Sequence, residues 1–176
     1  MHIPYGGWVA YASTLTSDIA GLVAQVVAKE LPGQRGLAAW QSLLKAHASL
    51  LRRLETDLEA QTGLQLSDYD VLAQLAFAGG ELRITELAVR ALISRSGMTR
   101  RVARLADQRL VRRESTGVDG RGVIVALTKS GLARLLETTS VHARGVRELF
   151  VAQLDDQELA ALQSALDKVT VDTTFG

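Results

Sequence analysis

The residues of this sequence best suited to chemistry are arginines, and they are concentrated in one short segment. Residues 94–114 contain no lysine and seven arginines, namely Arg95, Arg100, Arg101, Arg104, Arg109, Arg112 and Arg113. A guanidinium is a planar fork of N–H donors that can form two parallel hydrogen bonds with a phosphate or with O6 and N7 of guanine. The segment therefore indicates recognition of a polyanion.

The charge of the chain is distributed unevenly. Residues 83–121 hold ten arginines and four acidic side chains, a formal charge of +6, whereas the remaining residues carry −5, which leaves +1 for the whole chain. A cationic region within a mildly acidic protein is typical of a surface that binds nucleic acid. From charge alone, a solvated helix face balanced by salt bridges remains an equal alternative.

Other kinds of chemistry have little support. The chain has no cysteine, which removes disulfides, thiolate nucleophiles and a thiol-based peroxide sensor. The three histidines, His2, His47 and His142, show no metal-ligand spacing, so we expect surface or packing roles for them, no metal and no cofactor. No nucleophile paired with a base, carboxylate pair or phosphate loop is visible, so the sequence does not indicate an enzyme.

Length and composition are those of an ordinary globular protein. The chain has 176 residues, of which 47% are hydrophobic and 22% charged, and such a chain can bury a core. The start, MHIPYGGWVAYAS, lacks the basic leader of a secretory signal, and the apolar run at 21–28 is too short to cross a bilayer. We expect a cytoplasmic protein without membrane association.

A helix from Arg95 to about Arg109 must position the arginines. Ser94 is suited to cap it. Met98, Val102 and Leu105 recur at helical spacing and therefore share an inward face. Winding then turns the following residues outward or to one flank: Arg95, Ser96, Thr99, Arg100, Ala103, Arg104 and Asp107.

The neighbouring segments predict a helix-turn-helix. Thr85 is expected to cap a short helix that contains Leu87, Ala88 and Leu92, directly before the arginine-bearing helix. Upstream, LSDYDVL predicts a helix with Ser67 as N-cap and Asp70 in the capping-box position. That helix should stop at Gly79 and Gly80, and ELRI should form a short strand.

A β-hairpin is expected after the second short helix. The β-prone runs LVRRES and GVIVALT flank TGVDGR. Because this glycine-rich loop joins two strands, it is not a nucleotide cradle, which lies between a strand and a helix. Arg121, at the end of the loop, could enter a minor groove. Asp119 would be unfavourable beside phosphate unless Arg104 or Arg121 paired with it.

Long amphipathic helices flank this region. Residues 37–61 carry an apolar stripe with a period near that of an α-helix, and so long a stripe often packs on a second copy of itself. Thr128 is expected to cap a helix over 129–150, and Asp155 with Glu158 to form the capping box of a last helix. The predicted divisions are 1–36, an N-terminal extension with one amphipathic helix or else a disordered leader; 37–62, a dimerisation helix; 63–128, the DNA-binding domain; and 129–176, C-terminal dimerisation helices.

Three runs resemble the MarR-type winged helix-turn-helix transcription regulators: LSDYDVLAQLA, ITELAVRALISRSGMTRRVARLADQRLVRRE and DGRGVIVALTKSGLARL. The resemblance covers about residues 37–169. The helix pattern of the family appears as Thr99, Arg100 and Arg104. Its wing pattern appears as Asp119, Arg121, Leu127, Thr128 and Gly131. The resemblance implies a mainly α, or α+β, winged helix-turn-helix fold with N- and C-terminal dimerisation helices.

The sequence departs from the family in three places. Arg109 stands where the family usually has a helix-ending glycine, so a left-handed backbone there would be strained. Arg101 replaces a frequent apolar residue. The first 36 residues have no clear counterpart in the family.

The resemblance implies a homodimeric, sequence-specific regulator on double-stranded DNA, with two recognition helices about 34 Å apart on a pseudo-palindromic operator. It assigns Arg100 and Arg104 to the recognition helix and Arg121 to the wing tip. The full predicted DNA-binding set is Arg95, Ser96, Thr99, Arg100, Arg104, Asp119 and Arg121. A winged-helix protein–protein interaction module remains the alternative function.

Most members of the family are repressors that a small, often aromatic, ligand releases from DNA. For this chain we expect Trp40, His47 and Tyr69 as candidates to line an effector pocket, with core packing as the alternative role for each.

Overall fold

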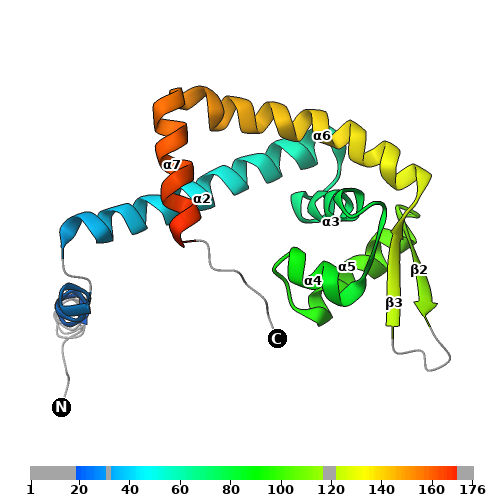
Figure 1. Ribbon diagram of the computed structural model, residues 1–176, viewed down its shortest axis with the longest axis horizontal. Coiled ribbons are helices and arrows are strands. Elements are labelled where there is room, and N and C mark those ends of the chain that lie inside the picture. The colour runs from blue at the N-terminus through cyan, green and yellow to red at the C-terminus, as the bar shows by residue number, and fades with distance from the viewer. Residues whose placement is uncertain (1–18, 31–32, 117–121, 170–176) are drawn as a thin grey trace, which may run out of the picture. The chain divides into compact units, whose positions relative to one another are not determined.

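The computed structural model describes residues 19–30, 33–116 and 122–169 (Figure 1). The chain divides into two compact units, Met1–Ser49 and Leu50–Gly176, and the boundary falls within the long helix α2, Gln34–Thr62. The N-terminal unit contains a helix over 19–30 and the first part of α2. Large apolar side chains on both of its helices are exposed, among them Ile19, Leu22, Val23, Val26, Trp40, Leu43 and Leu44.

The C-terminal unit is a winged helix-turn-helix domain followed by further helices. Its elements are the end of α2, α3 (Leu66–Phe77), β1 (Glu81–Arg83), α4 (Ile84–Arg90), α5 (Arg95–Asp107), β2 (Val111–Thr116), β3 (Gly122–Leu127), α6 (Lys129–Leu149), the 3-10 turn η1 (Val151–Gln153) and α7 (Asp156–Val169). In Figure 1, α3 lies between α6 and the pair α4 and α5, with the sheet beside them. The predicted mainly α winged helix-turn-helix fold is confirmed, and the dimerisation role of the flanking helices stays a prediction.

In the described residues, three antiparallel strands form one sheet in the order β1-β3-β2. Glu81 pairs with Ala126 and Arg83 with Ile124, while Val111 pairs with Leu127 at the other edge of β3. The predicted ELRI strand and the hairpin strands are therefore present, and β1 ties the hairpin to the start of α4.

One apolar core holds the helix-turn-helix together. Its fully buried members come from four elements: Val71, Leu72 and Leu75 of α3, Leu87 of α4, Met98, Val102 and Leu105 of α5, and Val125 of β3. Burial of each such side chain contributes about 1.5–3 kcal/mol. The predicted inward face of α5 is confirmed, and its burial fixes the opposite face outward.

Local capping residues were predicted correctly at three helices. The Ser94 Oγ accepts from the Gly97 N–H (3.1 Å) at α5, and the Thr128 Oγ1 accepts from the Gly131 N–H (2.9 Å) at α6. At α7, Asp155 and Glu158 form the expected reciprocal box: the Asp155 N–H donates to the Glu158 carboxylate, and the Glu158 N–H donates to that of Asp155.

The predicted caps Ser67 and Thr85 are wrong. The N-caps of α3 and α4 are Gln65 and Arg83, and neither makes a side-chain capping hydrogen bond. The start of α3 is fixed from outside, because the Leu66 N–H donates to the Glu55 carboxylate of α2 (3.0 Å). At α4, Arg83 is the last residue of β1 that pairs with β3, and the next residue, Ile84, is buried in the core. These two contacts fix where the helix begins.

The end of α4 also comes earlier than predicted. The helix stops at Arg90, so Leu92 is not part of it. Leu92 has a positive φ of 54° and an exposed side chain. At the end of α3, by contrast, Gly79 and Gly80 have φ values of 87° and 108°, as expected for glycines that end a helix.

Helix α5 ends in the left-handed turn that the sequence predicts to be strained. Arg109 has φ 59°, and the helix itself ends at Asp107. The Leu110 N–H donates to the Leu105 carbonyl (2.9 Å) and the Arg109 N–H to the Ala106 carbonyl (2.9 Å). This pair of bonds is the Schellman pattern, which favours glycine at the position of Arg109.

We expect Arg109→Gly to raise the free energy of unfolding by up to about 1 kcal/mol, because glycine adopts this φ without a Cβ clash. Urea denaturation followed by circular dichroism measures the change. Arg109→Ala is the matched control, since it removes the charge but keeps the Cβ. Equal stabilisation by both substitutions would show that charge, and not the backbone, is responsible.

Candidate nucleic-acid interface

The outer face of α5 presents polar side chains over a rigid base. Arg95, Ser96, Thr99 and Arg100 are all exposed, while Met98 beneath them is fully buried. The Thr99 hydroxyl donates to the Arg95 carbonyl (2.9 Å). Within the described residues, the guanidinium groups of Arg95 and Arg100 have no hydrogen-bond or ion-pair partner, so both are free to bind a ligand.

Arg104, by contrast, is bound to a buried carboxylate. Its Nε–H donates to Asp68 Oδ2 (3.1 Å), and its Nη2 donates to Asp68 Oδ1 (2.6 Å) and to Gln65 Oε1 (3.2 Å). These hydrogen bonds to Asp68 raise the pKa of Arg104 above its ordinary value. Partial burial opposes the shift, and the attraction between the two charges adds to it least. The Arg104 side chain still exposes 46% of its surface.

Arg101 belongs to the same cluster. Its Nη1 donates to the Ser67 carbonyl (2.8 Å), and its Nε lies 4.0 Å from Asp68 Oδ1. The position that departs from the family pattern therefore carries a side chain that links α5 to the first turn of α3.

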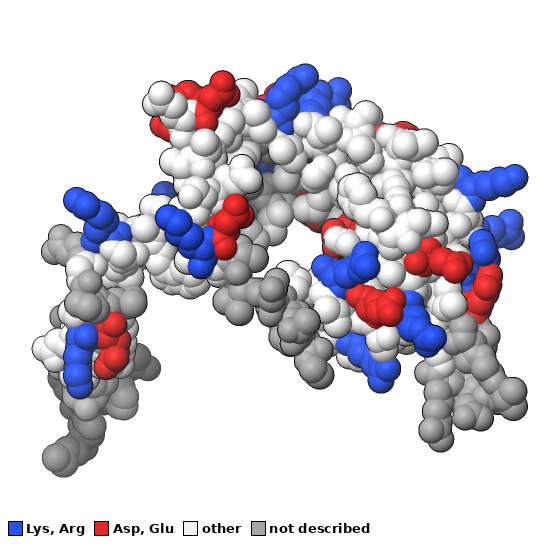
Figure 2. Space-filling model, viewed as in Figure 1, with Lys and Arg blue, Asp and Glu red and all other residues white. Residues whose placement is uncertain are grey.

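Some of the arginines in residues 94–114 form salt bridges. In this respect the structure agrees in part with the alternative of a helix face balanced by salt bridges. Arg104 pairs with Asp68 and Arg112 with Glu114, which raises the pKa of Arg112 chiefly through the hydrogen bond. On the face shown in Figure 2, basic and acidic side chains are interspersed over α4 and α5. Arg95 and Arg100 of α5, which have no ion-pair partner among the described residues, are therefore the stronger candidates for binding an anion.

A hollow of about 390 Å³ lies between the start of α4, the first part of α5 and the hairpin, where Gly122 and Val123 at the loop end of β3 line it. Three arginines line it, Arg83 of β1, Arg95 of α5 and Arg113 of β2, together with Thr99. Sequence reasoning did not assign Arg83 and Arg113 to the site. The alternation of side chains along a strand could have indicated which strand residues share a face. Only the observed pairing of β1 with β3 places Arg83 beside α5.

The predicted wing contacts, Asp119 and Arg121, lie outside the described residues. The predicted pairing of Asp119 with Arg104 or Arg121 therefore remains a prediction. The carboxylate that Arg104 does bind, Asp68, was missed because it is remote in sequence.

A larger cavity of about 870 Å³ lies in the C-terminal unit. Its lining includes Tyr69, Asp70 and Phe77 of α3, Arg101 of α5 and His142 of α6. The Tyr69 and His142 rings stack with centroids 4.7 Å apart. Burial lowers the pKa of His142 below its ordinary value, and the nearby Asp70 carboxylate partly opposes this shift.

Of the three predicted effector-pocket residues, Tyr69 lines this cavity. Trp40 and His47 are exposed residues in the part of α2 that belongs to the N-terminal unit. His142, for which the sequence predicted a surface or packing role, joins Tyr69 at the cavity.

Comparison with known proteins identifies the family to which this chain belongs. Residues 62–122, from the end of α2 through the hairpin, match the family model described as "MarR family". The structure resembles that of AbsC, a MarR family transcriptional regulator from Streptomyces coelicolor, with 30% identity and a TM-score of 0.72 over 78% of this chain and 93% of that one. The chain belongs to the MarR family.

A second similar MarR structure was solved with bound DNA. Sco3205, a MarR family transcriptional regulator from Streptomyces coelicolor solved in complex with DNA, is 31% identical with a TM-score of 0.72, over 78% of this chain and 86% of that one. This MarR-family protein is accordingly a DNA-binding transcriptional regulator. A search of curated proteins found no match.

A more distant MarR-like structure is that of the organohalide-sensing regulator RdhR in its 2,4-dichlorophenol-bound form. It is 18% identical, with a TM-score of 0.68 over 78% of this chain and 80% of that one, and supports the fold alone. No helix in the described part of this MarR-family chain is long and apolar enough to span a membrane.

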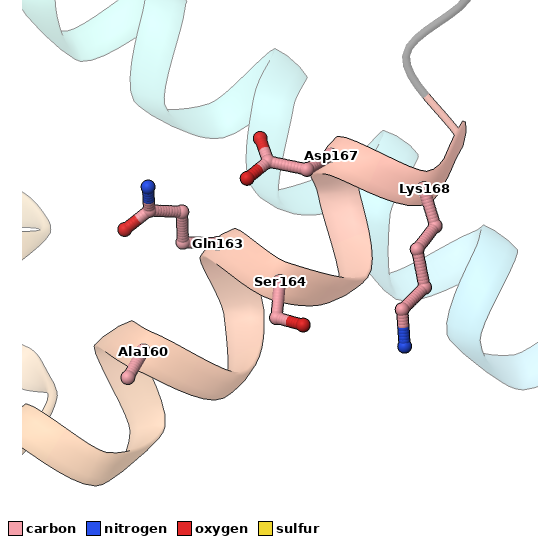
Figure 3. A pocket seen from close by; sticks show the side chains of 5 residues that line it. All are labelled: Ala160, Gln163, Ser164, Asp167 and Lys168. Atoms are coloured by element: carbon pink, nitrogen blue, oxygen red, sulfur yellow. The ribbon is translucent and has the colours of Figure 1, made fainter.

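A further hollow lies on α7 of this MarR-family protein (Figure 3). Its lining residues, Ala160, Gln163, Ser164, Asp167 and Lys168, all come from one side of that helix. A groove along a single helix lacks converging polar groups from other elements, so we assign no function to it.

Proposed function

We propose that the protein is a sequence-specific repressor that binds a pseudo-palindromic DNA operator as a homodimer and is released by a small aromatic effector. The observation that carries the proposal is the face of α5 with the free guanidinium groups of Arg95 and Arg100 above the buried Met98, Val102 and Leu105.

The proposed contacts follow from the chemistry of that face. Arg100 can bond the O6 and N7 atoms of guanine in the major groove with two N–H groups. Ser96 and Thr99, with the backbone N–H groups of the first turn, suit phosphate or base edges. Arg95 and Arg113 suit the phosphates beside the groove, and Arg121 a minor groove next to it.

Exposed apolar surface supports a homodimer. Within the C-terminal unit, Leu132 and Leu136 of α6 leave large parts of their side chains exposed, and the helices of the N-terminal unit also carry exposed apolar stripes. Contiguous apolar surface of this kind marks an association site. A two-fold dimer would place two copies of α5 in successive major grooves, about 34 Å apart.

The cavity beside Tyr69 and His142 suits a planar effector. Two stacked rings and Phe77 offer apolar contact, while Arg101 and Asp70 offer polar contact. The fold relative RdhR was solved with 2,4-dichlorophenol, which makes a phenol a sensible first probe. Such a ligand weakens DNA binding only if it prefers the conformation that binds DNA less well. Trp40 and His47 are not among the residues that line this cavity, and a role for them in an effector pocket remains a prediction.

Footprinting on DNA that flanks the gene, repeated at several salt concentrations and with 2,4-dichlorophenol, tests the proposal. We expect a protected palindrome, and an affinity that falls by about 10³-fold or more between roughly 50 and 200 mM salt if six or more phosphates are neutralised. Addition of the phenol should weaken the protection. A protein that binds DNA weakly and without sequence preference would instead support a protein–protein interaction module.

A further inference from the structure

A carboxylate buried beneath α5 determines what one of its arginines can do. Asp68 lies in the first turn of α3, and its side chain exposes 3% of its surface. It accepts two hydrogen bonds from Arg104, from Nε (3.1 Å) and from Nη2 (2.6 Å). The pair is therefore a bidentate one, the geometry that holds a guanidinium most firmly.

Most N–H groups of the Arg104 guanidinium on the side of Asp68 and Gln65 are already in hydrogen bonds. A guanidinium has five N–H groups, one on Nε and two on each Nη. Asp68 takes the Nε–H and one N–H of Nη2, and Gln65 Oε1 takes the other N–H of Nη2 at 3.2 Å. Among the described residues, only the N–H groups of Nη1 have no partner.

This count leaves no free pair of nitrogens. Recognition of guanine through O6 and N7 needs two parallel N–H groups from two nitrogens of one arginine. Both such edges of Arg104 include Nη2. Asp68 closes the edge formed by Nε and Nη2, and the exposed hydrogen bond from Nη2 to Gln65 Oε1 (3.2 Å) closes the edge formed by Nη1 and Nη2. A single phosphate oxygen, by contrast, needs only Nη1.

Release of Arg104 from Asp68 would be unfavourable. The Asp68 carboxylate would stay buried, with Arg101 4.0 Å away as its nearest remaining cation. The Nη1 of Arg101 is itself held by the Ser67 carbonyl at 2.8 Å. A buried charge that loses its partner is strongly destabilising.

We infer that Asp68 is a positioning residue that fixes Arg104 as a contact to the DNA backbone, so that Arg104 strengthens binding to every sequence and selects none. The inference rests on the proposed function and narrows the recognition-helix contact that the family resemblance implies for Arg104 to a contact with the DNA backbone. Base selection then falls to Arg100 and its neighbours at the start of α5.

The experiment measures binding of the full-length protein to a library of the footprinted operator with every single base-pair change. Arg104→Lys and Arg104→Ala should weaken binding to all sequences by a similar factor, about 5- to 30-fold. The ratio between the best and the altered sequences should stay within about twofold of wild type, because lost phosphate contacts act evenly.

Asp68→Asn tests the positioning role. An asparagine at 68 has one acceptor oxygen and an NH2 group in place of two oxygens, so it cannot accept the two parallel bonds from Arg104. The freed edge should change discrimination at one base pair of each half-site by about fivefold or more. The double variant Asp68→Asn with Arg104→Ala should lack that change. Asp107→Asn, an exposed residue of α5, removes the same charge and should leave the pattern of preferences unaltered.

The possible results distinguish failure of the proposed function from failure of the inference about Asp68 and Arg104. A wild-type protein without sequence preference would refute the proposed function. A wild-type preference that Arg104→Lys reduces by about tenfold at one base pair would refute only the inference, because it would show bidentate reading. Unchanged preference in a folded Asp68→Asn protein would also overturn it. If Asp68→Asn does not fold, the Arg104→Lys result decides.

Discussion

Gly131→Ala is expected to lower the free energy of unfolding of the C-terminal unit by about 3–5 kcal/mol, the largest stability effect that the structure predicts. A Cβ at this position would lie 1.9 Å from the Leu110 carbonyl oxygen and 3.0 Å from a methyl group of Leu127. The gain from replacing a helical glycine by alanine, about 0.5–1 kcal/mol, is much smaller.

The backbone at Leu110 cannot easily move away. Its carbonyl accepts hydrogen bonds from the Thr128 N–H (3.1 Å) and the Thr128 hydroxyl (3.0 Å). Close approach of Gly131 thus anchors the first turn of α6 to the start of the hairpin. The Leu-Thr-x-x-Gly pattern of Leu127, Thr128 and Gly131 therefore has a physical reason in this fold.

Thermal and urea unfolding would measure the effect, with Gly145→Ala in the same helix as the control. A Cβ at Gly145 would meet the end of the Leu54 side chain at 2.8 Å. Because that side chain can adjust, we expect a change within about 1 kcal/mol. Similar values for the two variants would show that the contact with Leu110 relaxes freely.

Arg100→Ala is expected to have the largest effect on DNA binding. The loss should be about 1–3 kcal/mol of operator affinity, roughly 5- to 150-fold, with relaxed preference at the base that Arg100 reads. Because the exposed guanidinium has no partner among the described residues, the free energy of unfolding should change by less than about 0.5 kcal/mol. The substitution should therefore weaken operator binding while leaving the stability of the fold nearly unchanged.

Fluorescence anisotropy with the operator and with scrambled DNA provides the measurement. Arg147→Ala, which removes an exposed arginine of α6 with its Glu148 pair, should leave the preference for operator intact. If Arg100→Ala bound both DNAs as wild type does, the assignment of α5 as the reading helix would be wrong.

The sequence was informative wherever a local pattern decides the structure. The spacing of Met98, Val102 and Leu105 predicted which face of α5 is buried, and Ser94 predicted its first residue. The strain at Arg109 was also predictable, because the need for a left-handed residue after a helix is local.

Contacts between distant segments could not be predicted. Ser67 is a good capping residue, yet α3 begins before it because Glu55 accepts the Leu66 N–H. The pairing of Asp68 with Arg104 depends on how α3 packs on α5, which side-chain volumes in the core determine. The helical pattern of the sequence places both Arg100 and Arg104 on the outward face of α5. Only the hydrogen bonds in the structure distinguish Arg104, which is bound to Asp68, from Arg100.

The pairing of β3 has a consequence for how the hairpin can be redesigned. Strand β3 pairs with β2 along its whole length, from Gly122 to Leu127, but with β1 only over Ile124–Ala126. Insertions or deletions between Thr116 and Gly122 would thus alter the length of the hairpin arm, by about 3.3 Å per residue in each strand, without shifting the register at its base. The length of this arm can therefore be changed by design while the pairing that joins the hairpin to α4 stays the same.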